Sequence, residues 1–356
     1  MNAAIEVIRP DDRLGKVEVE KLLKKEGIER DPHLDYTAGL YDTEGRLIAT
    51  GSCFQNTIRC LAVTSELQGE GLMATVVSHL LKVQASRGND PVFLYTKPES
   101  AVIFADLGFS EIVRLSDVVF MENRKDGFLT WLTGIQKTLS ERPLKLPGRR
   151  KNARIAAVVM NANPFTLGHR YLLEQASKEN DRVILFLLSE ENGPIPYAMR
   201  KKLVEAGIED LPKVVLVPAG SYIISHATFP SYFLKSEENV IRAHAELDLS
   251  LFGRIAEALG ITRRYVGEEP FSRVTSVYNE LMARELPKTG VECRIVPRLA
   301  AGDVPVSAST VREALQKGDF EILRTLLPES TYDYFCSEEA APVLEAIRKA
   351  GDVRHY

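Results

Sequence analysis

The feature that most constrains the fold is an apolar run that leads directly into a tight turn and a helix. Residues 155–160 (IAAVVM) are continuously apolar, and 163–169 follow them as NPFTLGH, with helical character over 170–176. In such a unit a glycine lets the backbone approach a ligand, and the new helix points free N–H groups and its positive dipole end into the gap. The sequence therefore predicts a phosphate-binding turn with His169 as a ring donor; a βα turn without function is the alternative.

Apolar runs of this kind recur through the C-terminal part of the chain. Strands are expected at 155–160, 183–188, 214–217, 264–266 and 294–296, and helices at 169–178, 197–207 and 250–259. Several of these strands lack polar alternation, which is typical of strands buried on both faces of a parallel sheet. Right-handed crossovers then predict a doubly wound, Rossmann-like sheet with its ligand site at the carboxyl ends of the strands, where the first turn lies.

A second turn, residues 306–312, is suited to complete a nucleotide site. Its sequence is VSASTVR, and an apolar-periodic helix follows it. Ser307 and Ser309 are good N-cap residues, and Ser309 can also donate to a phosphate. Arg312 offers a guanidinium fork for phosphate oxygens. A capped surface helix with a solvated arginine is the alternative interpretation.

The N-terminal part of the chain has a different pattern. Residues 1–35 are polar with helical spacing, whereas 36–63 are typical of paired strands with a turn at Asp42–Gly45. A further strand leads into a glycine-bearing turn that opens a helix, and exposed N–H groups there can hold a pyrophosphate. A turn that only caps the helix is the alternative. The candidate ligand residues of this turn are Gln68, Gly69 and Gly71.

A helix and a linker join the two parts. Residues near 126–139 carry apolar side chains at helical spacing, and the segment up to 152 is rich in proline, glycine and basic residues without a period. The sequence predicts an α+β domain over 1–125, a connecting segment over 126–152, and a parallel-sheet domain with C-terminal helices over 153–356.

Composition excludes several function classes. The 356 residues carry a formal net charge of −4, which gives no electrostatic case for nucleic acid or an anionic membrane. The longest apolar runs are far shorter than the ~20 residues that span a bilayer. The charged N-terminus lacks the apolar segment of a signal peptide, and the four cysteines show no C-x-x-C spacing. A cytoplasmic protein without a metal-binding cluster is expected.

The N-terminal part resembles the GNAT acetyltransferase family. Gln68 and Gly71 match its acyl-CoA signature Q/R-x-x-G-x-G/A, although Met73 stands where Gly or Ala is usual. Residues 93–96 and 101–109 look like that family's closing strand, helix and turn. The resemblance implies that the Gln68–Gly71 turn binds a CoA-like arm.

The two C-terminal turns resemble the HxGH nucleotidyltransferase superfamily. Thr166, Gly168 and His169 match its first motif, H/T-x-G-H, and residues 306–312 match its closing motif, I-S-S-T-x-x-R, with three mild substitutions. Asn163 stands where many adenylyltransferases have Asp. The resemblance implies attack of an oxygen nucleophile on the α-phosphate of a nucleotide, with release of pyrophosphate and no covalent enzyme intermediate.

This resemblance implies three catalytic residues and a set of ATP contacts. His169 and Arg312 are expected to hold phosphate oxygens, Thr166 to donate to one of them, and Mg²⁺ to share the charge of the pyrophosphate. The expected ATP contacts are Asn161, Asn163, Phe165, Gly168, Gly267, Glu268, Ser307 and Ser309.

Two further motifs resemble the citrate lyase ligase family. ATFPSYFLK at 227–235 follows the third strand, and VGEEPFSRVT at 266–275 follows the fourth. Together with the other motifs they extend the resemblance over nearly the whole chain. It implies activation of acetate by ATP as acetyl-adenylate, then transfer of the acetyl group to the thiol of the CoA-like prosthetic group on the citrate lyase acyl-carrier subunit. Candidates for the acetate or transfer site, among which residue types do not choose, are His226, Thr228, Lys235 and Arg200.

Two other function classes stay open from the sequence. An adenylyltransferase acting on a phosphomonoester, such as a CoA precursor, would exchange pyrophosphate without acetate. A GNAT-type acetyltransferase with a regulatory nucleotide-binding domain would turn over acetyl-CoA without ATP. The intact Thr166, His169 and Arg312 argue against a degenerate nucleotide domain.

Overall fold

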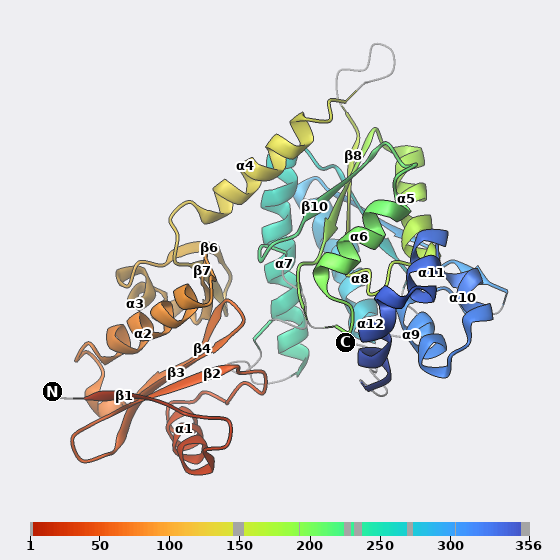
Figure 1. Cartoon of the computed structure of the whole chain (residues 1–356). Helices are drawn as coiled ribbons and strands as arrows, with labels where there is room; N and C mark the ends of the chain where they lie inside the picture. Colours follow the sequence, from red (N-terminus) through yellow and green to blue (C-terminus); the bar gives the residue numbers. More distant parts are fainter. Residues whose placement is uncertain are drawn as a thin grey trace. The chain divides into compact units, whose positions relative to one another are not determined.

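The chain divides into two compact units. The computed structural model describes residues 3–144, 153–191, 193–223, 229–230, 237–268, 273–302 and 304–349 (Figure 1). The N-terminal unit comprises Met1–Leu129 and Thr228–Leu247, and the C-terminal unit Thr130–Ala227 and Asp248–Tyr356. The segment Thr228–Leu247 thus belongs to the first unit although it lies between strands of the second. Within the described ranges no helix is both long and apolar enough to cross a membrane.

The N-terminal unit is built on a seven-stranded sheet in the order β1-β2-β3-β4-β5-β7-β6. The strands are β1 (Ala4–Val7), β2 (Tyr36–Tyr41), β3 (Leu47–Phe54), β4 (Thr57–Val63), β5 (Phe93–Thr96), β6 (Ser110–Arg114) and β7 (Val119–Glu122). Its helices include α1 (Arg13–Lys25), α2 (Leu72–Ser86) and α3 (Ala101–Asp106), and 3₁₀ turns lie at Ser65–Leu67 and Pro98–Ser100. Neighbouring strands are antiparallel except β4 and β5, which are parallel.

Strands β4 and β5 pair only at their first residues and then separate. Their ladder consists of Thr57 with Phe93 and Ile58 with Leu94. Just beyond it, Cys60 has a φ of +51° and the register between β3 and β4 shifts. A bulge of this kind bends a strand and increases its twist. The bend opens a space between the carboxyl halves of β4 and β5, next to the start of α2.

The C-terminal unit contains a wholly parallel five-stranded sheet in the order β10-β9-β8-β11-β12. Its strands are β8 (Ile155–Met160), β9 (Arg182–Leu187), β10 (Val214–Pro218), β11 (Arg263–Gly267) and β12 (Glu292–Val296), and a short ladder joins β13 (Ala300–Ala301) to β14 (Val304–Pro305). The chain order changes direction between β8 and β11. The crevice at the carboxyl ends of these two strands is therefore the topological switch point, where ligands bind in such sheets.

Helices cover both faces of this sheet. They are α4 (Gly127–Ser140), α5 (Leu167–Glu179), α6 (Tyr197–Gly207), α7 (Glu237–Leu259), α8 (Arg273–Glu285), α9 (Ala308–Lys317), α10 (Phe320–Leu326), α11 (Glu329–Cys336) and α12 (Ala341–Lys349), with 3₁₀ turns at Leu286–Thr289 and Glu338–Ala340. Val158 faces a core that includes residues of α5, α6 and α9–α12, whereas Phe186 contacts Trp131 of α4 on the other face. Figure 1 shows β8 with α5 on one side and α7 on the other.

The predicted fold class, an α+β domain followed by a doubly wound parallel sheet, is confirmed. Several elements were not predicted from the sequence, among them β6, β7, β13 and β14. Residues 4–7 form a strand at the sheet edge, whose mostly exposed side chains give no apolar alternation. The helix α8 begins at Arg273, inside a segment that the sequence analysis treated only as a motif, and α7 begins well before the predicted position of 250.

Candidate active site

The first turn leaves β8 and is closed by a capping box. Thr166 is the N-cap of α5, and its Oγ1 accepts a hydrogen bond from the His169 backbone N–H at 3.3 Å. In return, the Thr166 backbone N–H donates to Nδ1 of His169 at 3.1 Å. Phe165 is fully buried, and its ring stacks on His169 with a centroid distance of 5.8 Å and an interplanar angle of 17°. The His169 ring is therefore held both at its edge and at its face.

These contacts fix which ring nitrogen of His169 carries the proton. A backbone N–H can only donate, so Nδ1 must accept from Thr166, and the neutral ring then carries its hydrogen on Nε2. Burial, together with the positive charge of Arg298, lowers the pKa of His169 from 6.5 to about 4. At neutral pH His169 is thus a neutral hydrogen-bond donor through Nε2.

The second turn packs directly against the first. A Cβ placed on Gly168 would lie 2.7 Å from the backbone oxygen of Val306, so only glycine permits this approach. The short ladder of β13 and β14 returns the chain to this place, where the Val306 N–H donates to the Leu299 carbonyl at 3.0 Å. Arg312 Nη1 also donates to the Asn163 carbonyl at 2.7 Å. Two segments that lie about 140 residues apart in the sequence thus meet at the switch point.

The helix after the second turn presents a desolvated cation. Ser307 is the N-cap of α9 and accepts from the Thr310 N–H at 3.0 Å. Arg312 Nη2 donates to Ser309 Oγ at 3.1 Å. Among the described residues no ion pair of Arg312 is found; burial lowers the pKa of its guanidinium, and the nearby charge of Glu313 only partly offsets this. A partly buried cation without a counter-ion is stabilised by an anionic ligand.

Asn163 lies between the two turns. Its side chain is 8% exposed, and its Oδ1 has no hydrogen-bond partner within the described residues. Its amide rests on Gly193, where a Cβ would lie 1.8 Å from Nδ2. An unpartnered buried acceptor at this place suits a ligand that carries a proton or a cation. No group of three or more His, Cys, Asp or Glu in the described part of the chain forms a metal site of its own.

Arg200 connects the loops that follow β8 and β9. It is 1% exposed, and its Nη1 donates to the Asn161 carbonyl at 2.7 Å, to Asn161 Oδ1 at 2.8 Å and to the Leu188 carbonyl at 2.8 Å. Its other donors are directed at the carbonyls of Ile195 and Glu190. These contacts orient the loops around the switch point. They also hold the exposed Asn161 by its side-chain oxygen, so that its amide NH₂ remains available to a ligand.

The expected nucleoside contacts Gly267 and Glu268 are exposed at the carboxyl end of β11. β11 runs parallel to β8 and pairs with it over Arg263–Tyr265, so this end lies at the same edge of the sheet as the first turn. The Glu268 N–H donates to the Val296 carbonyl at 2.9 Å, and Asn279 of α8 donates to the Gly267 carbonyl at 3.2 Å. The candidate acetate residues His226, Thr228 and Lys235 lie outside the described residues.

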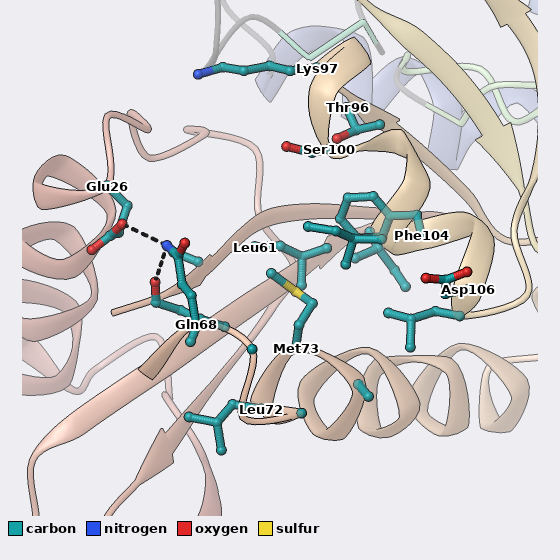
Figure 2. A pocket seen from close by; sticks show the side chains of 18 of the residues that line it. Glu26, Leu61, Gln68, Leu72, Met73, Thr96, Lys97, Ser100, Phe104 and Asp106 are labelled. Carbon is teal, nitrogen blue, oxygen red and sulfur yellow. Dashed lines mark hydrogen bonds between the residues drawn. The ribbon is translucent and has the colours of Figure 1, made fainter. Parts of the chain in front are cut away.

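The N-terminal unit contains a cavity of about 500 Å³ between β4, β5, α2 and α3. Gln68, Gly69 and Gly71 line it, and the φ angles of the two glycines, +89° and +77°, shape the turn that opens α2. Gln68 Nε2 donates to Glu26 and to the Val63 carbonyl, both at 3.3 Å. Figure 2 shows Met73 and Leu61 near the middle of this cavity, with Asp106 on the side opposite Glu26. No side chain caps the N-terminus of α2.

Sequence analysis missed one charged residue of the C-terminal site. Arg298 follows β12 and acts on the pKa of His169 through its charge. A cation just beyond the last parallel strand was the available signal, because the carboxyl ends of all these strands meet at one edge.

Comparisons with known proteins agree with this geometry. The family model for the citrate lyase ligase C-terminal domain matches residues 155–335, which include both turns. The chain is 37% identical to the citrate (pro-3S)-lyase ligase of Escherichia coli (strain K12) over 316 residues, 86% of this chain and 87% of the relative. It is 39% identical to the Klebsiella pneumoniae protein of the same name over 295 residues, 81% of this chain and 83% of that relative.

This chain belongs to the citrate lyase ligase family. The family assignment covers both units, because the matched relatives span most of the chain. Among solved structures, Escherichia coli ElaA is similar with a TM-score of 0.29 at 13% identity, over 35% of this chain and 99% of that chain. An acetyltransferase of the GNAT family from Staphylococcus aureus Mu50 gives a TM-score of 0.28 at 14% identity, over 34% of this chain and 100% of that chain.

Proposed function

We propose that this chain activates acetate with ATP and transfers the acetyl group to the prosthetic-group thiol of the citrate lyase acyl-carrier subunit. The observation that carries the proposal is the packing of Gly168 on the Val306 carbonyl, which joins two anion-binding turns at the switch point of a parallel sheet. Membership of the citrate lyase ligase family supports acetate and the carrier as substrates.

In the first step an acetate oxygen attacks the α-phosphorus of ATP. The bond between that phosphorus and the α–β bridging oxygen breaks, and pyrophosphate leaves with the electron pair. His169 donates from Nε2 to a phosphate oxygen, and Arg312 neutralises the charge that develops on the leaving group. Thr166 holds the His169 tautomer and position. Catalysis is positioning plus charge stabilisation, so no enzyme nucleophile is required.

Mg²⁺ fits this site as a partner of the ATP phosphates. The described residues provide no carboxylate cluster for a metal, but Mg²⁺ commonly keeps most of its ligands as phosphate oxygens and waters. The unpartnered Oδ1 of Asn163 is the oxygen that this chain offers beside the phosphates. Bound there, the ion would reduce the negative charge of the triphosphate.

In the second step the thiol of the carrier's CoA-like arm attacks the acetyl carbon, a thioester forms and AMP leaves. The thiol proton passes to solvent or to the departing phosphate. The cavity beside Gln68–Gly71 has the size and the uncapped helix N-terminus that a CoA-like arm requires.

Acetate-dependent exchange of labelled pyrophosphate into ATP tests the first step. The wild type is expected to exchange pyrophosphate only when acetate is present. The exchange rate of His169→Ala should fall at least about a hundredfold, because this variant lacks one donor that stabilises charge on the phosphate. His33→Ala removes a histidine whose side chain is 64% exposed and is the matched control. Exchange without acetate would instead identify an adenylyltransferase, and acetyl-CoA turnover without ATP a GNAT-type acetyltransferase.

A cavity-filling substitution tests the second step. Ala74 lines the cavity, whereas the next residue on α2, Thr75, is exposed and does not. Ala74→Trp is expected to leave pyrophosphate exchange intact and to abolish acetyl transfer to the carrier. Thr75→Trp should preserve both reactions. Transfer at the wild-type rate by a stably folded Ala74→Trp protein would exclude the cavity as the site of the arm.

A further inference from the structure

A buried charged cluster joins α7, β11 and α8. Asp248 of α7 and Arg264 of β11 are 2% and 4% exposed, and Arg264 Nη1 lies 3.3 Å from Asp248 Oδ2. Tyr278 of α8 donates its hydroxyl hydrogen to the same carboxylate oxygen. A helix, a strand and a second helix of the C-terminal unit therefore meet at one carboxylate.

Burying this charged cluster in the core gives little net stabilisation. Desolvation of two charges offsets much of their attraction, and an apolar replacement of the same volume is often as stable or more stable. The Arg264 guanidinium lies 4.3 Å from the centroid of the Phe252 ring, and its Nε is buried without a hydrogen-bond partner among the described residues. Stability alone does not explain the cluster. We infer that its directional contacts serve to hold α7, β11 and α8 in a fixed arrangement.

The residue after Tyr278 shows what that geometry controls. Asn279 is 7% exposed, and its Nδ2 donates to the carbonyl of Gly267 at 3.2 Å. Gly267 is the exposed last residue of β11, at the carboxyl edge of the sheet, where it pairs with Val296 of β12. Rotation or sliding of α8 would carry the Asn279 amide away from this carbonyl. The contacts of Tyr278 one position earlier oppose such a movement.

We propose that Asn279 is a positioning residue for the nucleoside of ATP, and that Asp248, Arg264 and Tyr278 fix the helix that carries it. The inference rests on the proposed function, in which the turn at Gly267 and Glu268 contacts ATP. Asn279 acts through the Gly267 backbone and does not touch the reacting atoms. Its loss therefore weakens ATP binding and leaves the acetate site unchanged.

The test compares Asn279→Ala with Asn180→Ala. Asn180 serves as a control because it is 1% exposed and its Nδ2 donates to the Ala176 carbonyl at 2.8 Å, with a second bond to the Tyr265 hydroxyl at 3.1 Å. It precedes β9 and so lies at the opposite, amino edge of the same sheet. ATP binding is measured by calorimetry without acetate, and KM for ATP and for acetate by pyrophosphate exchange. Thermal unfolding of each variant reports its stability.

Asn279→Ala is expected to raise both the Kd and the KM for ATP about tenfold, with KM for acetate and kcat within twofold of wild type. Tyr278→Phe should shift ATP binding in the same direction by a smaller factor. Asn180→Ala should lower the melting temperature without changing either KM. Unchanged ATP binding in Asn279→Ala, or equal changes in both KM values, would overturn the inference. Wild-type protein that binds ATP but shows no acetate-dependent exchange would overturn the proposed function instead.

Discussion

Substitution of Gly168 by alanine tests the central contact of the site. The added Cβ would lie 2.7 Å from the Val306 oxygen, about 0.7 Å closer than the 3.4 Å at which ordinary contact begins. The opposing atom is a backbone oxygen, and Val306 is only 4% exposed, so it cannot rotate away. Relief of the clash must move the start of α5 away from the 306–312 turn by several tenths of an ångström.

Stability and activity respond differently to this change. Alanine is favoured over glycine in a helix by up to about 1 kcal/mol, whereas overpacking costs about 1–3 kcal/mol, so the net loss of stability is about 0–3 kcal/mol. A misplacement of about 1 Å in a catalytic constellation costs about a hundredfold in rate. We therefore expect Gly168→Ala to lose about 10- to 100-fold in kcat for acetate-dependent pyrophosphate exchange while it remains folded.

Gly134→Ala is the matched control. Gly134 lies within α4, and a Cβ there meets nothing within 4 Å. This variant should keep wild-type exchange and gain up to about 1 kcal/mol of stability from helix propensity. A Gly168→Ala protein with kcat within twofold of wild type would refute the argument that the two turns must meet at this distance.

Three further predictions follow from the geometry. The pKa of His169 is lowered to about 4, so the neutral donor persists as pH falls from 7 and kcat/KM for ATP should show no His169 inflection near pH 6.5. His169 takes up a proton below pH 6.5 in the unfolded state but not in the folded state, so acid favours unfolding. Between pH 6.5 and 4 the free energy of unfolding of the wild type, measured in urea, should therefore fall by up to about 3 kcal/mol relative to that of His169→Gln. Arg200→Met removes the donor to the carbonyls of Asn161, Leu188 and Ile195 and should lower the melting temperature, measured with and without ATP. Cys60→Val places a β-branched residue at a φ of +51° and should cost about 1–3 kcal/mol of stability, measured by urea unfolding, and weaken CoA binding to the cavity.

Sequence reasoning succeeded where local pattern and topology give the same answer. The strand 155–160 and the helix 197–207 were predicted at their observed bounds, because fully apolar runs and a clear helical period leave little choice. The first turn was predicted to lie at the carboxyl edge of the sheet, because it directly follows a strand. The contact between Gly168 and Val306 was implied only by the pairing of two motifs.

The features that were missed depend on long-range packing. The bulge at Cys60 arises from the pairing of β4 with β3, and residue types do not encode it. Arg200 was predicted as a candidate for the acetate or transfer site, but its burial depends on hydrogen bonds to the carbonyls of Asn161 and Leu188 in two loops. The sequence does carry a helical pattern for α8, since Leu281 lies four residues after Val277 and so shares one helix face with it, and Met282 follows directly.

The two candidate anion sites use different chemistry, and their helix ends explain why. At α5 the capping box uses the His169 N–H and fixes the ring, so in the proposed function His169 Nε2 and Arg312 are the side-chain donors for phosphate. At α2 the N-cap is Gly71 with a φ of +77°, no side chain closes the first turn, and the backbone N–H groups remain for an anion. Side-chain donors of defined tautomer and charge suit a site where charge develops during reaction. Backbone donors, which do not titrate, suit a site that only has to hold a diphosphate arm while its thiol reacts elsewhere.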